Sequence, residues 1–221
     1  MDLLYAAHVP AGEGPFPTIL ALHGWGASAL DLIGLAPELN QGEARVLSPQ
    51  GPIGIRIPGG PMGYGWYPLG EGSQASPEEL TQASAQVLDF LDVAQQRYPV
   101  DPRKVVLLGF SQGGALAFDL ALRDCSRFAG VAALSSWLPE GVAAQIEPDT
   151  AHQSLPVLLV HGTEDPMVPV DRARESRQKL TSLGVALTYR EDEMGHEICA
   201  EALRDIIGWI DEKVLHPIQL A

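Results

Sequence analysis

Ser111 is the first residue in this sequence whose surroundings point to chemistry. It lies in the pentapeptide GFSQG at 109–113, which matches the pattern G-x-S-x-G. Residues 104–108 read as a buried strand and 113–123 as a helix, so the serine lies in a tight turn that needs neighbours almost without side chains. Its oxygen would then project from the carboxyl edge of a sheet, at the positive end of a helix. We predict that Ser111 is a nucleophile; the alternative is a structural Gly-Ser turn.

A serine hydroxyl reacts only when a base accepts its proton, and the base needs an acid that orients it. Asp165 follows the predicted strand 156–160, and His196 follows the predicted strand 185–189. Both lie just beyond the carboxyl ends of their strands. The chain order serine, acid, histidine is that of the α/β-hydrolases, and differs from the chymotrypsin and subtilisin orders.

Other histidines and carboxylates compete for these two roles. His196 is favoured because it both follows the acid and directly precedes a helical segment. The remaining histidines lie near the ends of the chain, in a loop or before a glycine in a turn: His8, His23, His152, His161 and His216. The acids that stay open as alternatives to Asp165 are Glu164, Asp171, Asp192 and Glu193.

The negative charge that develops on a carbonyl oxygen under attack needs hydrogen-bond donors fixed in advance. The backbone N–H of Gln112 is one candidate, because it follows the nucleophile at a helix start. Residues 22–28, LHGWGAS, are the candidate source of a second donor, and we choose the amide of Trp25. The alternative is a glycine-rich turn before a helix capped by Ser28.

Two long turn-rich stretches, 50–74 and 139–154, interrupt the regular elements. Long loops in compact domains are often binding loops or lids. The first contains GYGWY at 63–67, in which aromatic residues stand among glycines. We therefore predict that Trp66 and Tyr67 bind substrate. The alternative is that these aromatic side chains fold back onto the core or form a dimer contact.

Short apolar runs that alternate with helical segments must position these residues, and this alternation is typical of a parallel sheet covered on both faces. The expected strands are 16–22, 44–47, 104–108, 128–134, 156–160 and 185–189, with a possible edge strand at 3–9. The expected helices are 30–39, 77–98, 113–123, 171–183 and 197–214. Ser76, Pro77 and Glu79 form a capping pattern at the start of the second helix.

The composition describes an ordinary globular chain: 221 residues, 46% hydrophobic, with a net charge of −14. We expect one α/β domain spanning 1–221, with a mostly parallel sheet and little or no lid. The acidic charge argues against nucleic acid and anionic membranes as partners. Cys125 and Cys199 are expected to be buried, reduced thiols within helices. Without a leader-like or membrane-spanning stretch, the expected location is the cytoplasm.

Four motifs together resemble the phospholipase/carboxylesterase family of α/β-hydrolases, which includes acyl-protein thioesterases. They are LHGWG at 22–26, GFSQGG at 109–114, HGTEDPMVP at 161–169 and MGH at 194–196. The resemblance implies a catalytic triad of Ser111, Asp165 and His196. It also implies an oxyanion hole formed by the amides of Trp25 and Gln112, and a place for Met167 in the acyl pocket. It implies no metal and no cofactor.

The function expected on these grounds is a serine carboxylesterase that acts on small esters through an acyl-enzyme, as a monomer or homodimer. Where the thioesterase branch has a Ser-Trp-Phe-like motif, this chain has GWYP at 65–68. We therefore expect short-to-medium acyl chains rather than palmitoyl. The alternatives are an acyl-protein thioesterase, a lysophospholipase or a catalytically silent binding module. A dienelactone hydrolase is disfavoured because that family generally has cysteine at the position of Ser111. A true lipase is disfavoured because it needs an apolar lid, for which this chain is too short and too acidic.

Overall fold

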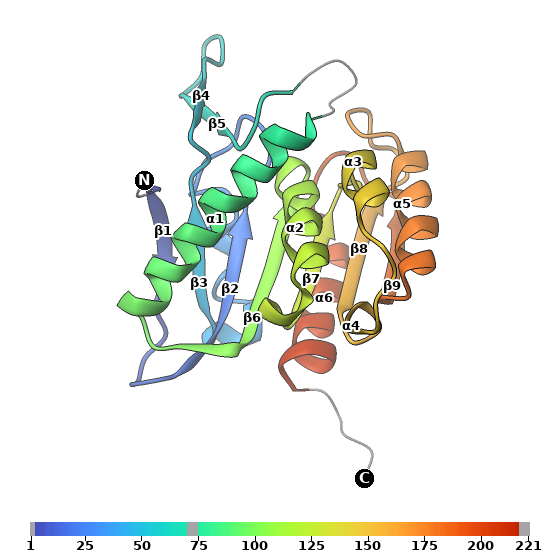
Figure 1. Cartoon of the computed structure of the whole chain (residues 1–221). Coiled ribbons are helices and arrows are strands. Elements are labelled where there is room, and N and C mark those ends of the chain that lie inside the picture. The colour runs from blue at the N-terminus through green and yellow to red at the C-terminus, as the bar shows by residue number, and fades with distance from the viewer. Residues whose placement is uncertain (1–2, 70–74, 217–221) are drawn as a thin grey trace.

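The computed structural model describes residues 3–69 and 75–216, and its centre is a seven-stranded sheet (Figure 1). The strand order is β1-β3-β2-β6-β7-β8-β9; β1 is antiparallel to β3 and the other neighbours are parallel. The strands are β1 Tyr5–His8, β2 Phe16–Leu22, β3 Arg45–Pro49, β6 Val100–Phe110, β7 Gly130–Leu134, β8 Pro156–Gly162 and β9 Ala186–Asp192. All six expected strands and the edge strand are present.

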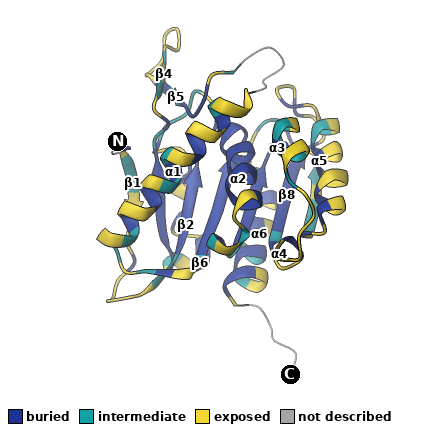
Figure 2. Cartoon of the chain, viewed as in Figure 1, coloured by how far each residue is buried: buried dark blue, intermediate teal, exposed yellow. Residues whose placement is uncertain are grey.

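Helices cover both faces of this sheet. The helices α1 Pro77–Arg97, α2 Gln112–Arg123 and α5 Val170–Leu183 cover one face, together with the short α3 Glu140–Gln145 and α4 Thr150–Gln153; α6 Ala200–Trp209 covers the other (Figure 1). Leu20 and Leu22 of β2 pack towards α1 and α2, whereas Ile19 and Ala21 pack towards α6. The strands are therefore buried on both sides (Figure 2), which explains why they are apolar without alternation.

Helix α1 begins as the sequence predicts. The Ser76 side chain accepts a hydrogen bond from the Glu79 amide at 3.2 Å, and the Glu79 carboxylate accepts one from the Ser76 amide at 3.0 Å. This reciprocal capping box satisfies two amides that have no partner inside the helix. The helix buries Leu80, Val87 and Leu91 against the sheet and exposes its opposite face (Figure 2).

The predicted helix 30–39 is wrong. The chain instead forms two short 3-10 turns, Ile33–Leu35 and Leu39–Gly42. Pro37 lacks an N–H and restricts the residue before it, so a regular α-helix cannot continue through this segment. The predicted helix 197–214 also differs, because α6 begins at Ala200 and continues after Trp209 as a π-helical turn, Ile210–Leu215.

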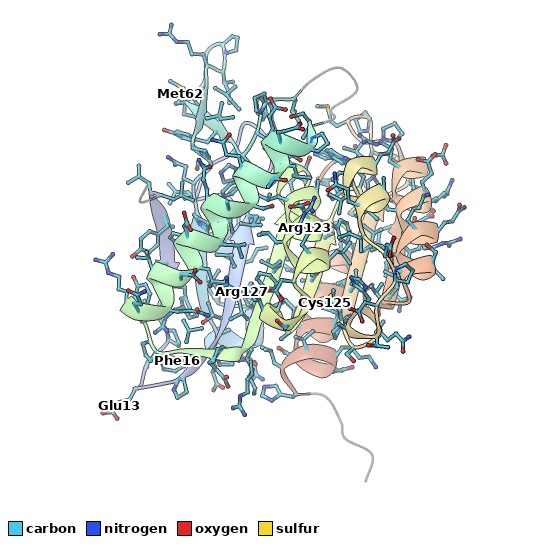
Figure 3. The ribbon with its side chains drawn as sticks, viewed as in Figure 1. Glu13, Phe16, Met62, Arg123, Cys125 and Arg127 are labelled. Carbon is cyan, nitrogen blue, oxygen red and sulfur yellow. The ribbon has the colours of Figure 1, made fainter. Side chains whose placement is uncertain are left out.

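The two long loops contain short elements of their own. In the first, β4 Ile53–Ile55 and β5 Gly63–Gly65 pair as an antiparallel hairpin, and Figure 3 shows Met62 near its outer end. Residues 70–74 of this loop lie outside the described residues. The second loop contains α3 and α4. Within 3–69 and 75–216, no helix is long and apolar enough to cross a membrane.

The two cysteines are less buried than expected. Cys125 starts a 3-10 turn, Cys125–Arg127, rather than lying in an α-helix, and Cys199 immediately precedes α6. Both are free thiols of intermediate exposure. The Cys199 sulfur lies 3.5 Å from the amide of Ala202, where it caps the helix.

Candidate active site

Ser111 lies at a sharp turn between β6 and α2. Its backbone has φ 52° and ψ −116°, a conformation that costs energy for a residue with a side chain. The surrounding structure holds it there: the Ser111 amide donates to the Leu134 carbonyl at 2.8 Å, and the Ser136 hydroxyl donates to the Ser111 carbonyl at 2.7 Å. Such over-determined strain is typical of functional positions.

The glycines on both sides of the turn are required by close backbone contacts. A Cβ on Gly109 would lie 2.4 Å from the Gly113 carbonyl oxygen, and a Cβ on Gly113 would lie 2.0 Å from the Leu22 carbonyl oxygen. Both distances are far below van der Waals contact. The spacing of the pentapeptide therefore reflects a steric need, as the sequence predicts.

His196 and Asp165 meet at the same edge of the sheet, after β9 and β8. The His196 Nδ1 lies 2.7 Å from Oδ2 of Asp165. Because a carboxylate only accepts, Nδ1 donates, and in the neutral ring Nε2 is left as the acceptor that a general base requires. The His196 ring also lies 4.9 Å, centroid to centroid, from Phe110, the residue before the serine.

The Asp165 carboxylate is buried, and backbone amides hold its other oxygen. Oδ1 accepts hydrogen bonds from the amides of Met167 and Val168, both at 2.8 Å. The rival acids Glu164, Asp171 and Glu193 are exposed, and Asp192 is only partly buried. Among the described carboxylates, Asp165 is the one within hydrogen-bond distance of His196.

A cavity of about 280 Å³ opens beside His196. It is lined by Asp31, Leu32, Leu35, Phe110, His196, Glu197 and Ile198. Its walls are mainly apolar, with two carboxylates at Asp31 and Glu197. Sequence reasoning did not find this cavity, because its lining comes from segments that lie far apart in the chain. Within residues 3–69 and 75–216, no group of three or more His, Cys, Asp or Glu residues is arranged to hold a metal ion.

The loop that carries Trp25 passes directly beside the nucleophile. A Cβ on Gly24 would lie 3.4 Å from the Ser111 Cβ and 3.1 Å from the Phe110 ring, so this loop and the elbow are in contact. The Gln112 amide is among the first N–H groups of α2, which have no acceptor within the helix. Both backbone amides chosen from the sequence therefore belong to segments adjacent to Ser111.

The predicted substrate-binding residues lie in different environments. Trp66 and Tyr67 are 3% and 2% exposed, so both side chains fold back into the protein, as the alternative reading proposed. Burial raises the pKa of the Tyr67 hydroxyl far above its usual range. Met167 is 70% exposed, and its amide is one of the two that hold Asp165. Trp25 is 37% exposed.

Of the five other histidines, His23 and His161 are completely buried, and both contact backbone groups. The Nε2 of His23 accepts from the Gly51 amide at 3.0 Å, and Nδ1 lies 2.7 Å from the Gly24 carbonyl oxygen. Burial lowers the pKa of His23. His161 is also buried, and its Nε2 lies 2.8 Å from the Val168 carbonyl oxygen and 3.5 Å from Oδ2 of Asp165.

Comparisons with known proteins show the family and the fold of this chain. A sequence model described as phospholipase/carboxylesterase matches residues 6–214. The chain is 28% identical to acyl-protein thioesterase 1 of Gibberella zeae, with 93% of this chain and 94% of that protein covered. The crystal structure of esterase PE8 is similar, at 27% identity and TM-score 0.79, over 95% and 98% of the two chains. The Bacillus cereus carboxylesterase, at 24% identity and TM-score 0.76 over 90% and 91%, shares the fold.

Proposed function

Because this chain belongs to the phospholipase/carboxylesterase family, we propose that it is a serine carboxylesterase that hydrolyses short-to-medium-chain esters through an acyl-enzyme. The observation that carries the proposal is the 2.7 Å hydrogen bond from His196 to the buried Asp165, with the His196 ring packed against Phe110, the residue before the strained serine. Asp165 orients the ring, His196 is the base and Ser111 is the nucleophile.

In the first half-reaction, the Ser111 oxygen bonds to the acyl carbon while Nε2 of His196 accepts its proton. The carbonyl oxygen becomes an oxyanion, which accepts hydrogen bonds from the amides of Trp25 and Gln112. His196 then gives its proton to the alcohol oxygen as the carbon–oxygen bond breaks. The alcohol leaves, and the acyl group stays on the serine.

In the second half-reaction, His196 accepts a proton from water, and the water oxygen attacks the acyl-serine carbon. The same two amides bind the second oxyanion. When it collapses, the bond to Ser111 breaks and the serine oxygen takes the proton back from His196. The acid leaves and the enzyme is restored, so the protein residues suffice for the full cycle.

The size of the cavity beside His196 supports small substrates. Its volume of about 280 Å³ is just below the range typical of ligand pockets, roughly 300 to 1,000 Å³. Met167, which is exposed next to the acid, is the proposed contact for the acyl group. Trp66 and Tyr67 are buried, so we propose that they support the substrate-binding loops from inside the protein.

A thioester is the second candidate substrate class. It is favoured by the curated relatives named acyl-protein thioesterase 1, which match this chain over at least 93% of its length. The same groups would act on it, because a thiolate leaves more easily than an alkoxide and asks less of the general acid. We also propose a cytoplasmic location, which the two free thiols support because oxidising compartments favour disulfides.

The test is hydrolysis of p-nitrophenyl esters, from acetate to palmitate, by the wild-type protein and by Ser111→Ala. We expect the wild type to be most active between acetate and octanoate. Ser111→Ala should lose at least about 10³-fold in kcat with every ester, because the nucleophile is gone. Ser182→Ala, which changes an exposed serine of α5, is the matched control and should keep wild-type activity.

Three outcomes would contradict parts of this proposal. If Ser111→Ala were nearly as active as the Ser182→Ala control, Ser111 would not be the nucleophile. A preference for palmitate would overturn the acyl-length expectation, and faster turnover of S-acyl than of matched O-acyl substrates would favour the thioesterase. A wild-type protein that neither hydrolyses esters nor reacts with a fluorophosphonate probe would be a binding module.

A further inference from the structure

The segment 63–67, which contains β5, contacts both sides of the proposed oxyanion donor Trp25 in the loop after β2. The Gly26 amide donates to the Tyr64 carbonyl, and the Tyr64 amide donates to the Ala27 carbonyl, both at 2.8 Å. The contact is so close that a Cβ on Gly63 would lie 2.2 Å from the Gly26 carbonyl oxygen. The hairpin therefore pairs with this loop almost as a further strand would.

The side chain of Gln112 reaches the same segment from the other half of the proposed oxyanion hole. Its Oε1 accepts a hydrogen bond from the Trp66 amide at 2.9 Å, and its Nε2 donates to the Tyr67 carbonyl at 2.7 Å. The side chain is buried, so neither bond competes with solvent. In the proposed site, Gln112 thus donates its backbone amide to the oxyanion and uses its side chain to hold Trp66 and Tyr67, which directly follow β5.

Trp66 continues this connection to the Trp25 loop. Its indole Nε1 donates to the His23 carbonyl at 2.8 Å, and its ring lies 5.0 Å, centroid to centroid, from the His23 ring. Trp66 is therefore bonded on one side to Gln112, through its backbone, and on the other side to His23, through its side chain.

His23 connects Trp66 to the peptide group that contains the Trp25 N–H, the proposed oxyanion donor. Because its Nε2 accepts from the Gly51 amide, its proton is on Nδ1, which donates to the Gly24 carbonyl. That carbonyl and the Trp25 N–H belong to one planar peptide group, so they point in opposite directions. Holding the carbonyl with the imidazole therefore sets the direction of the Trp25 N–H.

We propose that the side chains of Gln112, Trp66 and His23 form a brace that holds the Gln112 and Trp25 amides at a fixed spacing for the oxyanion. The inference rests on the proposed function and assigns positioning roles, since the three side chains act through backbone groups. An oxyanion hole is effective because its donors are fixed before the charge develops. A looser brace should weaken transition-state binding more than substrate binding.

The central variant is Trp66→Phe, which keeps an aromatic ring and removes the indole N–H. We expect kcat for p-nitrophenyl butyrate to fall by about tenfold, because small displacements of catalytic groups cost one to two orders of magnitude. KM should change less than twofold. The Ki of a trifluoromethyl ketone, whose serine adduct bears an oxyanion, should rise by the same factor as kcat falls.

The matched control is Trp209→Phe, the same change at another buried tryptophan, in α6 on the opposite face of the sheet. Gln112→Met breaks the brace at its other end, since it keeps the length of the side chain and removes both hydrogen bonds. Combined with Trp66→Phe, it should lower kcat little further than one change alone, because both interrupt the same connection. Melting temperatures, measured by circular dichroism, show whether each variant is folded.

Several results would overturn the brace. One is a Trp66→Phe enzyme whose kcat is within twofold of the wild type, and another is a Trp209→Phe enzyme that loses as much kcat as Trp66→Phe. The others are a Trp66→Phe enzyme with an unchanged Ki for the ketone, and a double variant in which the two losses of kcat are fully additive. If Trp66→Phe does not fold, Gln112→Met with the same kcat and Ki readouts decides the question. Failure of the proposed function is distinct, because it would leave Ser111→Ala as active as the wild type.

Discussion

At the scale of single residues, Asp165 shows how the protein holds a charge inside the fold. A buried carboxylate is costly unless hydrogen bonds replace its hydration. The amides of Met167 and Val168 bind one oxygen, and His196 binds the other. His161 adds to this arrangement by holding the Val168 carbonyl, on the residue whose amide binds Asp165. The loop that carries Asp165 therefore fixes the carboxylate independently of its hydrogen bond with His196.

The change Asp165→Asn should lower kcat by about 10³- to 10⁴-fold. An amide can present N–H₂ to His196 and favour the tautomer in which Nε2 carries the proton and cannot act as base. KM should change little, because the Asp165 side chain is buried beneath His196 and out of reach of a bound substrate. Steady-state kinetics with p-nitrophenyl butyrate measure the effect. Asp171→Asn, at an exposed carboxylate of α5, is the control, and a loss of similar size there would argue against the assignment.

At the scale of elements, the site depends on parallel strands whose carboxyl ends meet at one edge. The loops after β2, β6, β8 and β9 carry Trp25, Ser111, Asp165 and His196, respectively. At two places these segments approach backbone to backbone: a Cβ on Gly113 would meet the Leu22 carbonyl oxygen, and a Cβ on Gly162 would meet the Met194 carbonyl oxygen, so both positions are glycines. The helix α2 then packs its first turn against the end of β2. The elbow is therefore also a joint between two elements.

Two glycines in helices should respond in opposite ways to the same substitution. In Gly113→Ala, the new methyl group would meet the backbone of Leu22 and His23, which cannot move aside, so stability should fall by about 1–3 kcal/mol or more. In Gly208→Ala, nothing lies within 4 Å of the new group, and stability should rise by about 0.5–1 kcal/mol.

Urea unfolding followed by circular dichroism measures both changes. A Gly113→Ala protein as stable as the wild type would mean that α2 can shift away from β2. A destabilised Gly208→Ala protein would mean that other groups approach the new methyl group more closely than 4 Å.

At the scale of the whole molecule, one cluster of ion pairs connects two elements at the β9 edge of the sheet. Arg174 of α5 donates two hydrogen bonds to Glu191 of β9, at 2.9 and 2.7 Å, and one to Asp171 at 3.1 Å. The Tyr189 hydroxyl also donates to Glu191, at 2.8 Å. This cluster joins the last strand of the sheet to the helix that follows the loop of Asp165.

The cluster predicts how stability depends on pH. Hydrogen bonds from Arg174, with a smaller contribution from Tyr189, lower the pKa of Glu191 from 4.5 to about 2. Its stabilisation is therefore complete above pH 4.5 and disappears as the pH falls through 2. The difference in melting temperature between the wild type and Glu191→Gln should shrink steadily from pH 5.5 to pH 2.

The control for this prediction is Glu193→Gln, which changes an exposed carboxylate two residues away. Its difference from the wild type should vary less over the same pH range. Burial raises the pKa of Asp192 and Asp211, so these two groups favour the folded state at low pH and oppose the effect of Glu191. The comparison with Glu191→Gln cancels this opposing contribution, and a constant difference across the range would contradict the assignment.

Much of this protein could be predicted from the sequence, because the signals are local. Apolar runs predicted the strands, the capping pattern predicted α1, and glycines around Ser111 predicted the elbow. The chain order of the three motifs then predicted which loops share an edge of the sheet. The prediction failed at 30–39, where the chain forms two 3-10 turns and Pro37 interrupts any regular helix.

The tertiary structure decided what no local signal encodes. Trp66 and Gln112 are 46 residues apart, and Trp66 and His23 are 43 apart, yet each pair is joined by a hydrogen bond. Glycines and aromatics at 63–67 suit an exposed binding loop and a buried support equally well, because composition does not specify which distant backbone will approach. Hydrophobic pattern assigns a residue to a face, and packing between segments far apart in the chain decides which group it meets there.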